Sequence, residues 1–212
     1  ESCPTNIMSC TPESSKLSTC CSPKYGLVAF AVQWLPTMGP AKNWTIHGHW
    51  PDKCDGTFAP GDGCDNTRKY TGITGILAKR DPALLDRMNT LWPSSKGDNE
   101  WFFQHEFHKH GTCVSTMHPD CYADYQKHDD MVEYFTTALD MAQQYNPYDA
   151  FADAGIVPGG TYNRDDMIKA IAKKWNGMAA KLFCKRGQIE EIQMFFKVKG
   201  RNEHLPTSTL GK

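Results

Sequence analysis

YGLVAFAVQW, residues 25–34, is the stretch of sequence that decides the fold. It is almost continuously apolar and is flanked by turn-forming residues, which is typical of a strand buried in a sheet. Further strands are predicted over residues 45–50 and 189–199. In the last of these, one face is apolar by strict alternation, and its members are Ile192, Met194, Phe196 and Val198.

Helices are predicted over residues 72–80, 82–91, 100–109, 130–145 and 164–175. The predicted strands and helices are interspersed without regular alternation. That order favours an α+β fold, with helices packed around a sheet, over a doubly wound parallel sheet. A chain of 212 residues without internal repeats is expected to form one domain spanning residues 1–212.

The overall charge and hydropathy exclude several classes of function. A net charge of -1 provides no long-range field that could gather a polyanion, so any contact with nucleic acid must depend on a local site. The longest strongly apolar run, residues 27–32, is far shorter than the roughly 20 residues of a membrane-spanning helix. No membrane contact is therefore expected, and we expect the protein to act as a monomer.

The cysteines indicate the compartment. No C-x-x-C pair is present, so the spacing of a zinc-thiolate site is missing, and a disulfide framework in a secreted, vacuolar or lysosomal protein is predicted instead. The sequon at Asn43 makes this residue a candidate glycosylation site. The nine cysteines are Cys3, Cys10, Cys20, Cys21, Cys54, Cys64, Cys113, Cys121 and Cys184.

Five of the eight histidines lie in two short segments, WTIHGHWPD (residues 44–52) and HEFHKHGTC (residues 105–113). On a helix, at about 100° per residue, four ionisable side chains of the second segment share one arc, while Phe107 points away and can anchor the helix in the core. Desolvating such a group without a purpose would cost several kcal/mol, so a functional site is predicted here. The four side chains are His105, Glu106, Lys109 and His110.

Several kinds of site fit these residues poorly. The zinc-protease pattern H-E-x-x-H would need histidine at position 109, where the sequence has Lys109. A metal centre could combine His47 and His49 with the histidines of the second segment. On a strand, however, His47 and His49 share a face, and the ammonium of Lys109 disfavours a cation there. The Asp- and Gly-rich residues 54–66 lack the spacing of a calcium loop. No metal or cofactor is therefore expected.

The remaining interpretation is acid–base chemistry between two imidazoles. Thr112 in the second segment and Ser115 just after it lack the sequence context of an activated nucleophile. Imidazole can serve as base in one protonation state and as acid in the other near neutral pH. Phosphoryl transfer within RNA to its own 2′-hydroxyl needs such a pair and a cation such as Lys109, because the substrate supplies the nucleophile.

WTIHGHWPD and HEFHKHGTC closely resemble the two signature segments of the ribonuclease T2 family, the secreted or vacuolar acid endoribonucleases. The resemblance covers nearly the whole chain and is nearest to fungal members. It includes CCSPKYGL (residues 20–27), WPDKCDG (50–56), LWPS (91–94) and PGGTY (158–162). It implies an α+β fold with a central antiparallel sheet and metal-independent cleavage of single-stranded RNA, without DNA cleavage, through a 2′,3′-cyclic phosphate to 3′-phosphates.

The same resemblance implies a role for each matching residue. His110 corresponds to the general base, His47 to the general acid, Glu106 and Lys109 to stabilisers of the pentacovalent phosphate, and His105 to a phosphate contact. The primary base pocket would contain Trp50, Asp52 and Phe58, the last in place of a tyrosine. The second base site would contain Gln33, Pro93, Ser94 and Phe102.

Three residues depart from the family pattern. His49 replaces the usual leucine and is interpreted as non-catalytic, and Phe103 and Phe107 stand where tryptophan is common. The competing hypothesis is a secreted, disulfide-rich binding or toxic module in which ribonuclease activity is incidental. The resemblance also implies four disulfides and leaves Cys184 without a cysteine near the C-terminus, so one free thiol is expected. These disulfides are Cys3–Cys21, Cys10–Cys54, Cys20–Cys121 and Cys64–Cys113.

Overall fold

The computed structural model describes residues 2–211 of the chain. Its strands are β1 (Leu27–Gln33), β2 (Thr45–Asp52), β3 (Ala180–Lys185), β4 (Gln188–Lys199) and β5 (Glu203–Pro206). Its α-helices are α1 (Ile73–Arg80), α2 (Pro82–Leu91), α3 (Asn99–Lys109), α4 (Asp129–Gln144), α5 (Pro147–Asp153) and α6 (Arg164–Lys174). Short 3₁₀ turns occupy Ser14–Lys16, Asn66–Arg68, Gly111–Cys113, Ser115–Met117 and Pro119–Cys121.

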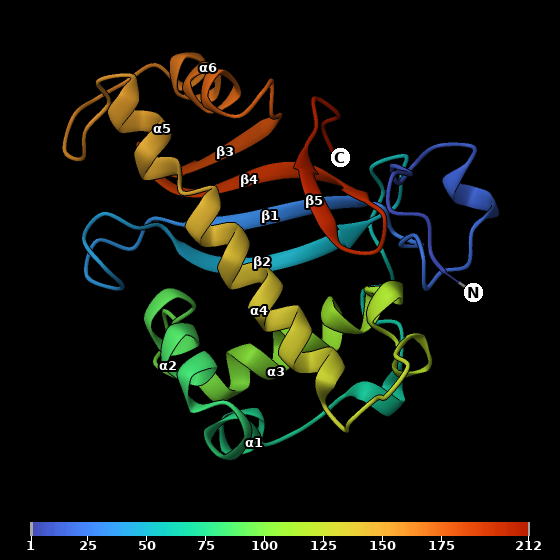
Figure 1. Cartoon of the computed structure of the whole chain (residues 1–212). Helices are drawn as coiled ribbons and strands as arrows, with labels where there is room; N and C mark the ends of the chain where they lie inside the picture. Colours follow the sequence, from blue (N-terminus) through green and yellow to red (C-terminus); the bar gives the residue numbers. More distant parts are fainter. Residues whose placement is uncertain (1, 212) are drawn as a thin grey trace.

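The strands form one antiparallel sheet in the order β2-β1-β4-β3, with β5 paired to β4 as well. The predicted α+β fold with a central antiparallel sheet is confirmed. The apolar run of residues 25–34 supplies β1, which has a neighbour on each side and is buried along nearly its whole length. In Figure 1, α4 runs across the sheet, α1, α2 and α3 gather beyond the β2 edge, and α5 and α6 lie near β3.

The two faces of the sheet differ in what covers them. Residues such as Phe30, Met194 and Phe196 belong to the main core, which they share with the helices. The opposite face has a small cluster of Leu27, Ala29 and Phe195, against which Trp50 packs. The first face is therefore filled by helices, and the second remains partly open beside β2.

The predicted helices and strands match the structure to within a residue or two, and three elements were missed. The α5 helix begins at Pro147, directly after α4, with proline in the first turn where its missing N–H is tolerated. The β3 strand is exposed over its last three residues, and β5 has only four residues. Neither strand carries a strong alternating pattern that would distinguish it from a loop.

Four disulfides attach the N-terminal arm and the loops to this framework. They are the pairs that the family resemblance predicted: Cys3–Cys21, Cys10–Cys54, Cys20–Cys121 and Cys64–Cys113. The arm lies beside one end of the sheet (Figure 1), and Met8 forms an isolated bridge with Lys199 there. Within residues 2–211, Cys184 is the free cysteine, and it is exposed. None of the helices in this part of the chain is long and apolar enough to cross a membrane.

Candidate active site

The strand that carries the first histidine segment contains a β-bulge. Ala31 of β1 pairs with Gly48, whereas the next residue, Val32, pairs with Ile46, so His47 is an extra residue in β2. The extra residue breaks the two-residue period of the strand. The prediction that His47 and His49 share a face was therefore wrong, because they point to opposite sides of the sheet.

His49 faces the helix-covered side. Its side chain is 1% exposed and packs edge-on against Tyr134 of α4, whose hydroxyl donates a hydrogen bond of 2.8 Å to the His49 carbonyl. Its Nε2 atom lies 2.9 Å from Nε2 of His204 on β5. Burial and the neighbouring His204 hold the pKa of His49 well below its usual value. His49 is thus a neutral core residue.

The α3 helix carries the second histidine segment. Asp98 caps its N-terminus by accepting a hydrogen bond of 2.9 Å from the Trp101 N–H. Phe103 and Phe107 are fully buried, so both aromatic replacements keep their place in the core. The helix ends at Lys109, as predicted, and His110 follows as its C-cap residue, with right-handed helical dihedral angles and an N–H that donates a hydrogen bond of 3.0 Å to the Glu106 carbonyl.

The carboxylate of Glu106 is the centre of the site. It is 1% exposed, and its two oxygens lie 3.6 Å from His47 Nε2 and 3.5 Å from His110 Nε2. The indole N–H of Trp50 donates a hydrogen bond of 3.1 Å to the same carboxylate. Trp50 also stacks on the His110 ring at 5.3 Å between centroids. Two imidazoles from different segments are thereby fixed on either side of one buried acid.

Gly48 makes room for this arrangement. A Cβ atom added there would lie 2.1 Å from Trp50 Nε1 and 2.7 Å from a Glu106 oxygen. Only glycine leaves the indole and the carboxylate where they are. The backbone of the bulge is further held by Trp92, whose indole N–H donates a hydrogen bond of 2.9 Å to the His47 carbonyl.

The surroundings move the pKa values of the two histidines in opposite directions. Burial lowers the pKa of His47, but a hydrogen bond to Glu191 and the charges of Glu106 and Glu191 outweigh it, so the net pKa is raised. Burial and the charge of Lys109 lower the pKa of His110 to about 3. Burial raises the pKa of Glu106 to about 7. Such a separation is typical of an acid and a base that work as a pair.

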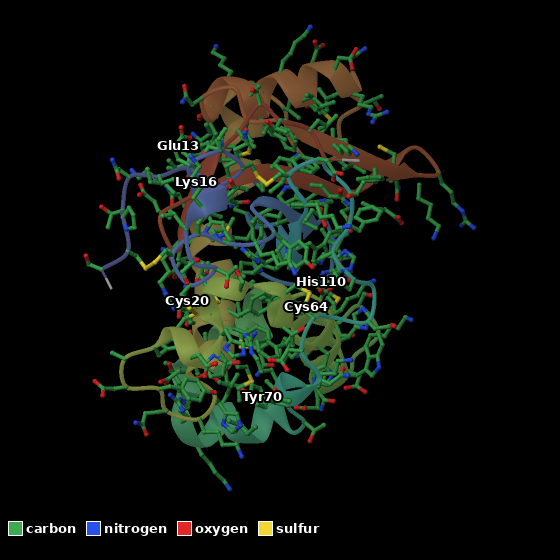
Figure 2. All side chains as sticks on the ribbon, turned by 90° about the vertical axis from the view of Figure 1, so that its right-hand side faces the viewer. Glu13, Lys16, Cys20, Cys64, Tyr70 and His110 are labelled. Atoms are coloured by element: carbon green, nitrogen blue, oxygen red, sulfur yellow. A yellow bond between two sulfur atoms is a disulfide. The ribbon has the colours of Figure 1, made fainter. Side chains whose placement is uncertain are left out.

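A cavity of about 540 Å³ adjoins these groups on the open face of the sheet. Trp50, Asp52 and Phe58, the three residues expected in the primary base pocket, line it together with Lys109 and His110. Phe58 is 70% exposed, and burial raises the pKa of Asp52 to about 7. The N–H of Cys113, the disulfide partner of Cys64, donates a hydrogen bond of 3.0 Å to the His110 carbonyl, and the labels of Cys64 and His110 lie next to each other in the view of Figure 2.

The residues expected at the second base site lie on the other side of His47 and do not line this cavity. Phe102 is 6.0 Å from the His47 ring, measured between centroids. Pro93 and Ser94 directly follow Trp92 and are buried. Gln33 forms a side-chain hydrogen bond with Glu191.

His105 stands apart from the Glu106 cluster. Its ring is exposed and stacks on Trp101 at 4.9 Å, and burial and the charge of Lys109 lower its pKa. The sequence analysis did not predict three residues that contact the histidines of the site: Trp92, Trp101 and Glu191. The sequence gives only a weak indication for Glu191. Alternation along β4 places its side chain on the face of the strand opposite to Ile192, but does not indicate which residue it contacts.

Asn43, the sequon residue, is half-buried and lies two residues before β2. Across residues 2–211 no three His, Cys, Asp or Glu side chains are placed so that they could hold a metal ion.

Comparison with known proteins agrees with this arrangement. The model of the Ribonuclease T2 family matches residues 14–204. The chain belongs to the ribonuclease T2 family. It is 44% identical to Ribonuclease Rh of Rhizopus niveus over 209 residues, which cover 99% of this chain and 87% of that protein. It is 37% identical to Ribonuclease T2 of Aspergillus oryzae over 219 residues, covering 99% and 79%.

Solved structures of ribonuclease T2 proteins share the fold. The crystal structure of Actibind, described as a T2 ribonuclease, superposes with a TM-score of 0.90 at 32% identity and covers 100% of this chain and 93% of that one. Human RNase T2 superposes with a TM-score of 0.61 at 21% identity, covering 84% and 88%, and shows the fold alone.

Proposed function

We propose that this ribonuclease T2 family enzyme cleaves single-stranded RNA by moving the phosphoryl group onto the neighbouring 2′-hydroxyl. The observation that carries the proposal is the pair of imidazoles, His47 and His110, held on either side of the buried Glu106 carboxylate with pKa values moved in opposite directions. One histidine is thereby suited to hold a proton and the other to accept one.

In the first step, His110 takes the proton of the 2′-hydroxyl, and the 2′-oxygen attacks phosphorus. His47 gives its Nε2 proton to the departing 5′-oxygen, so that a 2′,3′-cyclic phosphate and a free 5′-hydroxyl result. Lys109 and Glu106 stabilise the pentacovalent phosphate, and His105 contacts the phosphate from its exposed position. In the second step the roles reverse: His47 takes a proton from water, and His110 returns a proton to the 2′-oxygen, leaving a 3′-phosphate.

Base recognition is proposed on both sides of the scissile phosphate. Trp50, Asp52 and Phe58 form the primary base pocket, where aromatic stacking contributes about 1–3 kcal/mol per base. Because unpaired bases must reach this pocket, duplex RNA should be a poor substrate. The second base is assigned to Gln33, Pro93, Ser94 and Phe102.

The remaining properties follow from the same mechanism and from the disulfides. The substrate supplies the nucleophile, so no cofactor is required and DNA is not cleaved. Four disulfides favour a secreted protein. We further propose one domain, a monomer, and glycosylation at Asn43. A binding or toxic module is not favoured, because the relatives matched along 99% of the chain are named as ribonucleases.

The test uses an RNA oligonucleotide and a matched copy with a single 2′-deoxynucleotide, incubated with the protein and EDTA between about pH 4 and pH 7. Cleavage should stop only at the phosphate that follows the deoxynucleotide, and the products should end in 2′,3′-cyclic or 3′-phosphates. Cleavage at that phosphate, 5′-phosphate products or an inert RNA would refute the proposal. Loss of cleavage only when EDTA is present would instead indicate a metal-dependent reaction.

A further inference from the structure

Glu191 binds the nitrogen of His47 that faces away from Glu106. Glu191 lies on β4, and β1 separates this strand from β2 in the sheet. In the pairing of β1 with β4, Glu191 lies opposite Gln33. Its Oε2 atom lies 2.5 Å from His47 Nδ1, and its side chain is 16% exposed. His47 is therefore held between two carboxylates from different elements, one at each ring nitrogen.

The Glu191 carboxylate is fixed by groups other than His47. The side-chain amide of Gln193 donates a hydrogen bond of 3.0 Å to its Oε1 atom, and Gln33 provides a second side-chain hydrogen bond. Both glutamines lie on strands of the central sheet. The carboxylate is thus oriented on a rigid framework, and Oε2 remains for His47.

The contact determines which tautomer of His47 is present. An ionised carboxylate only accepts hydrogen bonds, so Nδ1 must carry the proton that it donates to Glu191. The proton that His47 gains and loses then belongs to Nε2, the nitrogen that faces Glu106 at 3.6 Å. A general acid at this position needs its mobile proton on that nitrogen.

We propose that Glu191 is a positioning residue for the general acid: its carboxylate holds His47 with Nε2 directed at the leaving 5′-oxygen and stabilises the imidazolium. This inference rests on the proposed function. Glu191 contacts neither the substrate nor the reacting atoms in this mechanism. Its effect on the reaction passes through His47.

The groups around His47 fit this role. Glu191 faces it from β4. Among residues 2–211, the other ionisable groups that interact with it come from α3 and the residue that follows it, namely His105, Glu106, Lys109 and His110. Three of these four can carry positive charge and disfavour the imidazolium. Two carboxylates, Glu106 and Glu191, counter them and the burial, and the net pKa of His47 is raised. Removal of one carboxylate should lower it.

The chain supplies a matched control. Glu190 precedes Glu191 in β4, points to the other side of the strand and is exposed. Glu191→Gln keeps the size of the side chain and removes its charge, while Glu190→Gln makes the same change next to it. Glu191→Asp keeps the charge and serves as the rescue variant.

The experiment compares these variants on two substrates. A diribonucleotide needs a proton on its leaving oxygen, whereas a nucleoside 3′-(4-nitrophenyl phosphate) has a leaving group that departs without one. We expect Glu191→Gln to lower kcat/KM on the diribonucleotide by about tenfold or more, part of the ~10²-fold or more that a lost general acid costs. On the aryl ester it should remain within about threefold of wild type. Glu190→Gln should match wild type on both.

The pH profile and the His47 pKa give the second readout. We expect Glu191→Gln to move the alkaline limb of kcat/KM on the diribonucleotide down by about 1 pH unit or more, the usual effect of an adjacent opposite charge. Glu191→Asp should restore part of that shift. Titration of the imidazole signals by NMR should show the same change at His47 in the absence of substrate.

Three results would overturn the inference: equal losses of Glu191→Gln on both substrates, an unshifted alkaline limb, or an unshifted His47 pKa by NMR. Equal losses would indicate a structural role, and thermal unfolding of each variant would show it directly. If the wild-type protein cleaves neither substrate, the proposed function fails. The NMR titration then still decides the Glu191 contact by itself.

Discussion

His47 and His49 are two residues apart on one strand and have opposite chemical surroundings. His47 lies on the open face of the sheet between two carboxylates, which raise its pKa in spite of burial. His49 lies on the helix-covered face against Tyr134 and His204, where burial lowers its pKa. The difference arises from one extra residue in β2, because a bulge turns consecutive histidines of an H-x-H unit to opposite faces.

The comparison shows that the partners of an imidazole, rather than its sequence neighbours, decide what it can do. On the open face, acids from α3 and β4 make a protonated imidazole stable. On the core face, His49 Nε2 lies 2.9 Å from Nε2 of another imidazole, that of His204, and a charge there would be costly. The same residue type therefore has the surroundings of an acid on one face, as the proposed mechanism requires, and those of a packed core residue on the other.

The largest expected effect separates the two histidines by activity. His47→Ala and His110→Ala should each lower kcat/KM on RNA by ~10²-fold or more, because each removes a general acid or base. His49→Leu, which restores the residue usual in the family, should stay within about threefold of wild type. Steady-state cleavage of one RNA oligonucleotide measures all three. Near-normal activity of His47→Ala, or a large loss in His49→Leu, would reverse the assignment of the two faces.

The second prediction distinguishes the two histidines by their effect on the free energy of unfolding at low pH. The pKa of His49 is well below 6.5 and that of His204 is about 4 in the folded protein, so the folded state binds fewer protons than the unfolded chain. Their stabilisation is fully present above pH 6.5 and is lost as the pH falls toward the folded values. At about 1.36 kcal/mol per pH unit, His204, with a folded pKa of about 4, costs about 2 kcal/mol at pH 5, and His49 adds a loss of the same sign.

His49→Leu should therefore lose less free energy of unfolding than wild type between about pH 7.5 and pH 5, because it no longer carries the low-pKa imidazole of His49. Denaturant unfolding at the two pH values measures the difference. His47→Leu is the control, and it should not reduce the acid loss, because the folded pKa of His47 is raised rather than lowered. An identical loss in wild type and His49→Leu would contradict a buried neutral His49.

The sequence predicted the elements of the fold better than the side on which each histidine lies. Continuous apolarity in residues 25–34 and strict alternation in β4 predicted strands that the structure contains. The bulge was not predictable from a two-residue period, since TIHGHW is also compatible with a regular strand. Gly48 was the available hint, because an isolated glycine in a strand is typical of a bulge or a close approach.

The residues of the site likewise fall into those that local sequence patterns predicted and those that they did not. Helical spacing brought Glu106 and Lys109 together, and the family resemblance added His47 from another segment. The contact between Glu191 and His47 joins residues 144 positions apart, and only the order of the strands brings them together. A local pattern cannot encode such a contact. Contacts between the histidines and residues distant in the sequence are therefore the part of the site that could not be predicted.

The third prediction tests whether the bulge itself matters to the open face. Gly48→Ala should lower kcat/KM by about tenfold, because the new Cβ atom would overlap the Trp50 indole and displace Glu106 from both histidines. Gly75→Ala is the control: it lies exposed in α1 with open space around it and should be neutral or slightly stabilising. Full activity of Gly48→Ala would show that the packing of Trp50 against Glu106 is dispensable.

The smallest expected effect concerns the rim of the open face, away from the hydrogen-bonded cluster. Phe58 is 70% exposed and lines the same cavity as Trp50 and Asp52, so its ring can stack on a base. Phe58→Tyr restores the hydroxyl usual in the family and adds at most one hydrogen bond, worth about 0.5–1.5 kcal/mol. We expect KM for dinucleotides to fall by about threefold, with kcat and the pH profile unchanged, because the surroundings of His47 and His110 are not altered.

Kinetics on a purine and a pyrimidine dinucleotide would show the change in KM. The control variant is Phe183→Tyr, which alters an exposed ring on the β3 side of the same cavity. A shift of the pH profile in Phe58→Tyr would mean that the rim is coupled to the two imidazoles, and the contrast between the faces would then extend across the whole cavity.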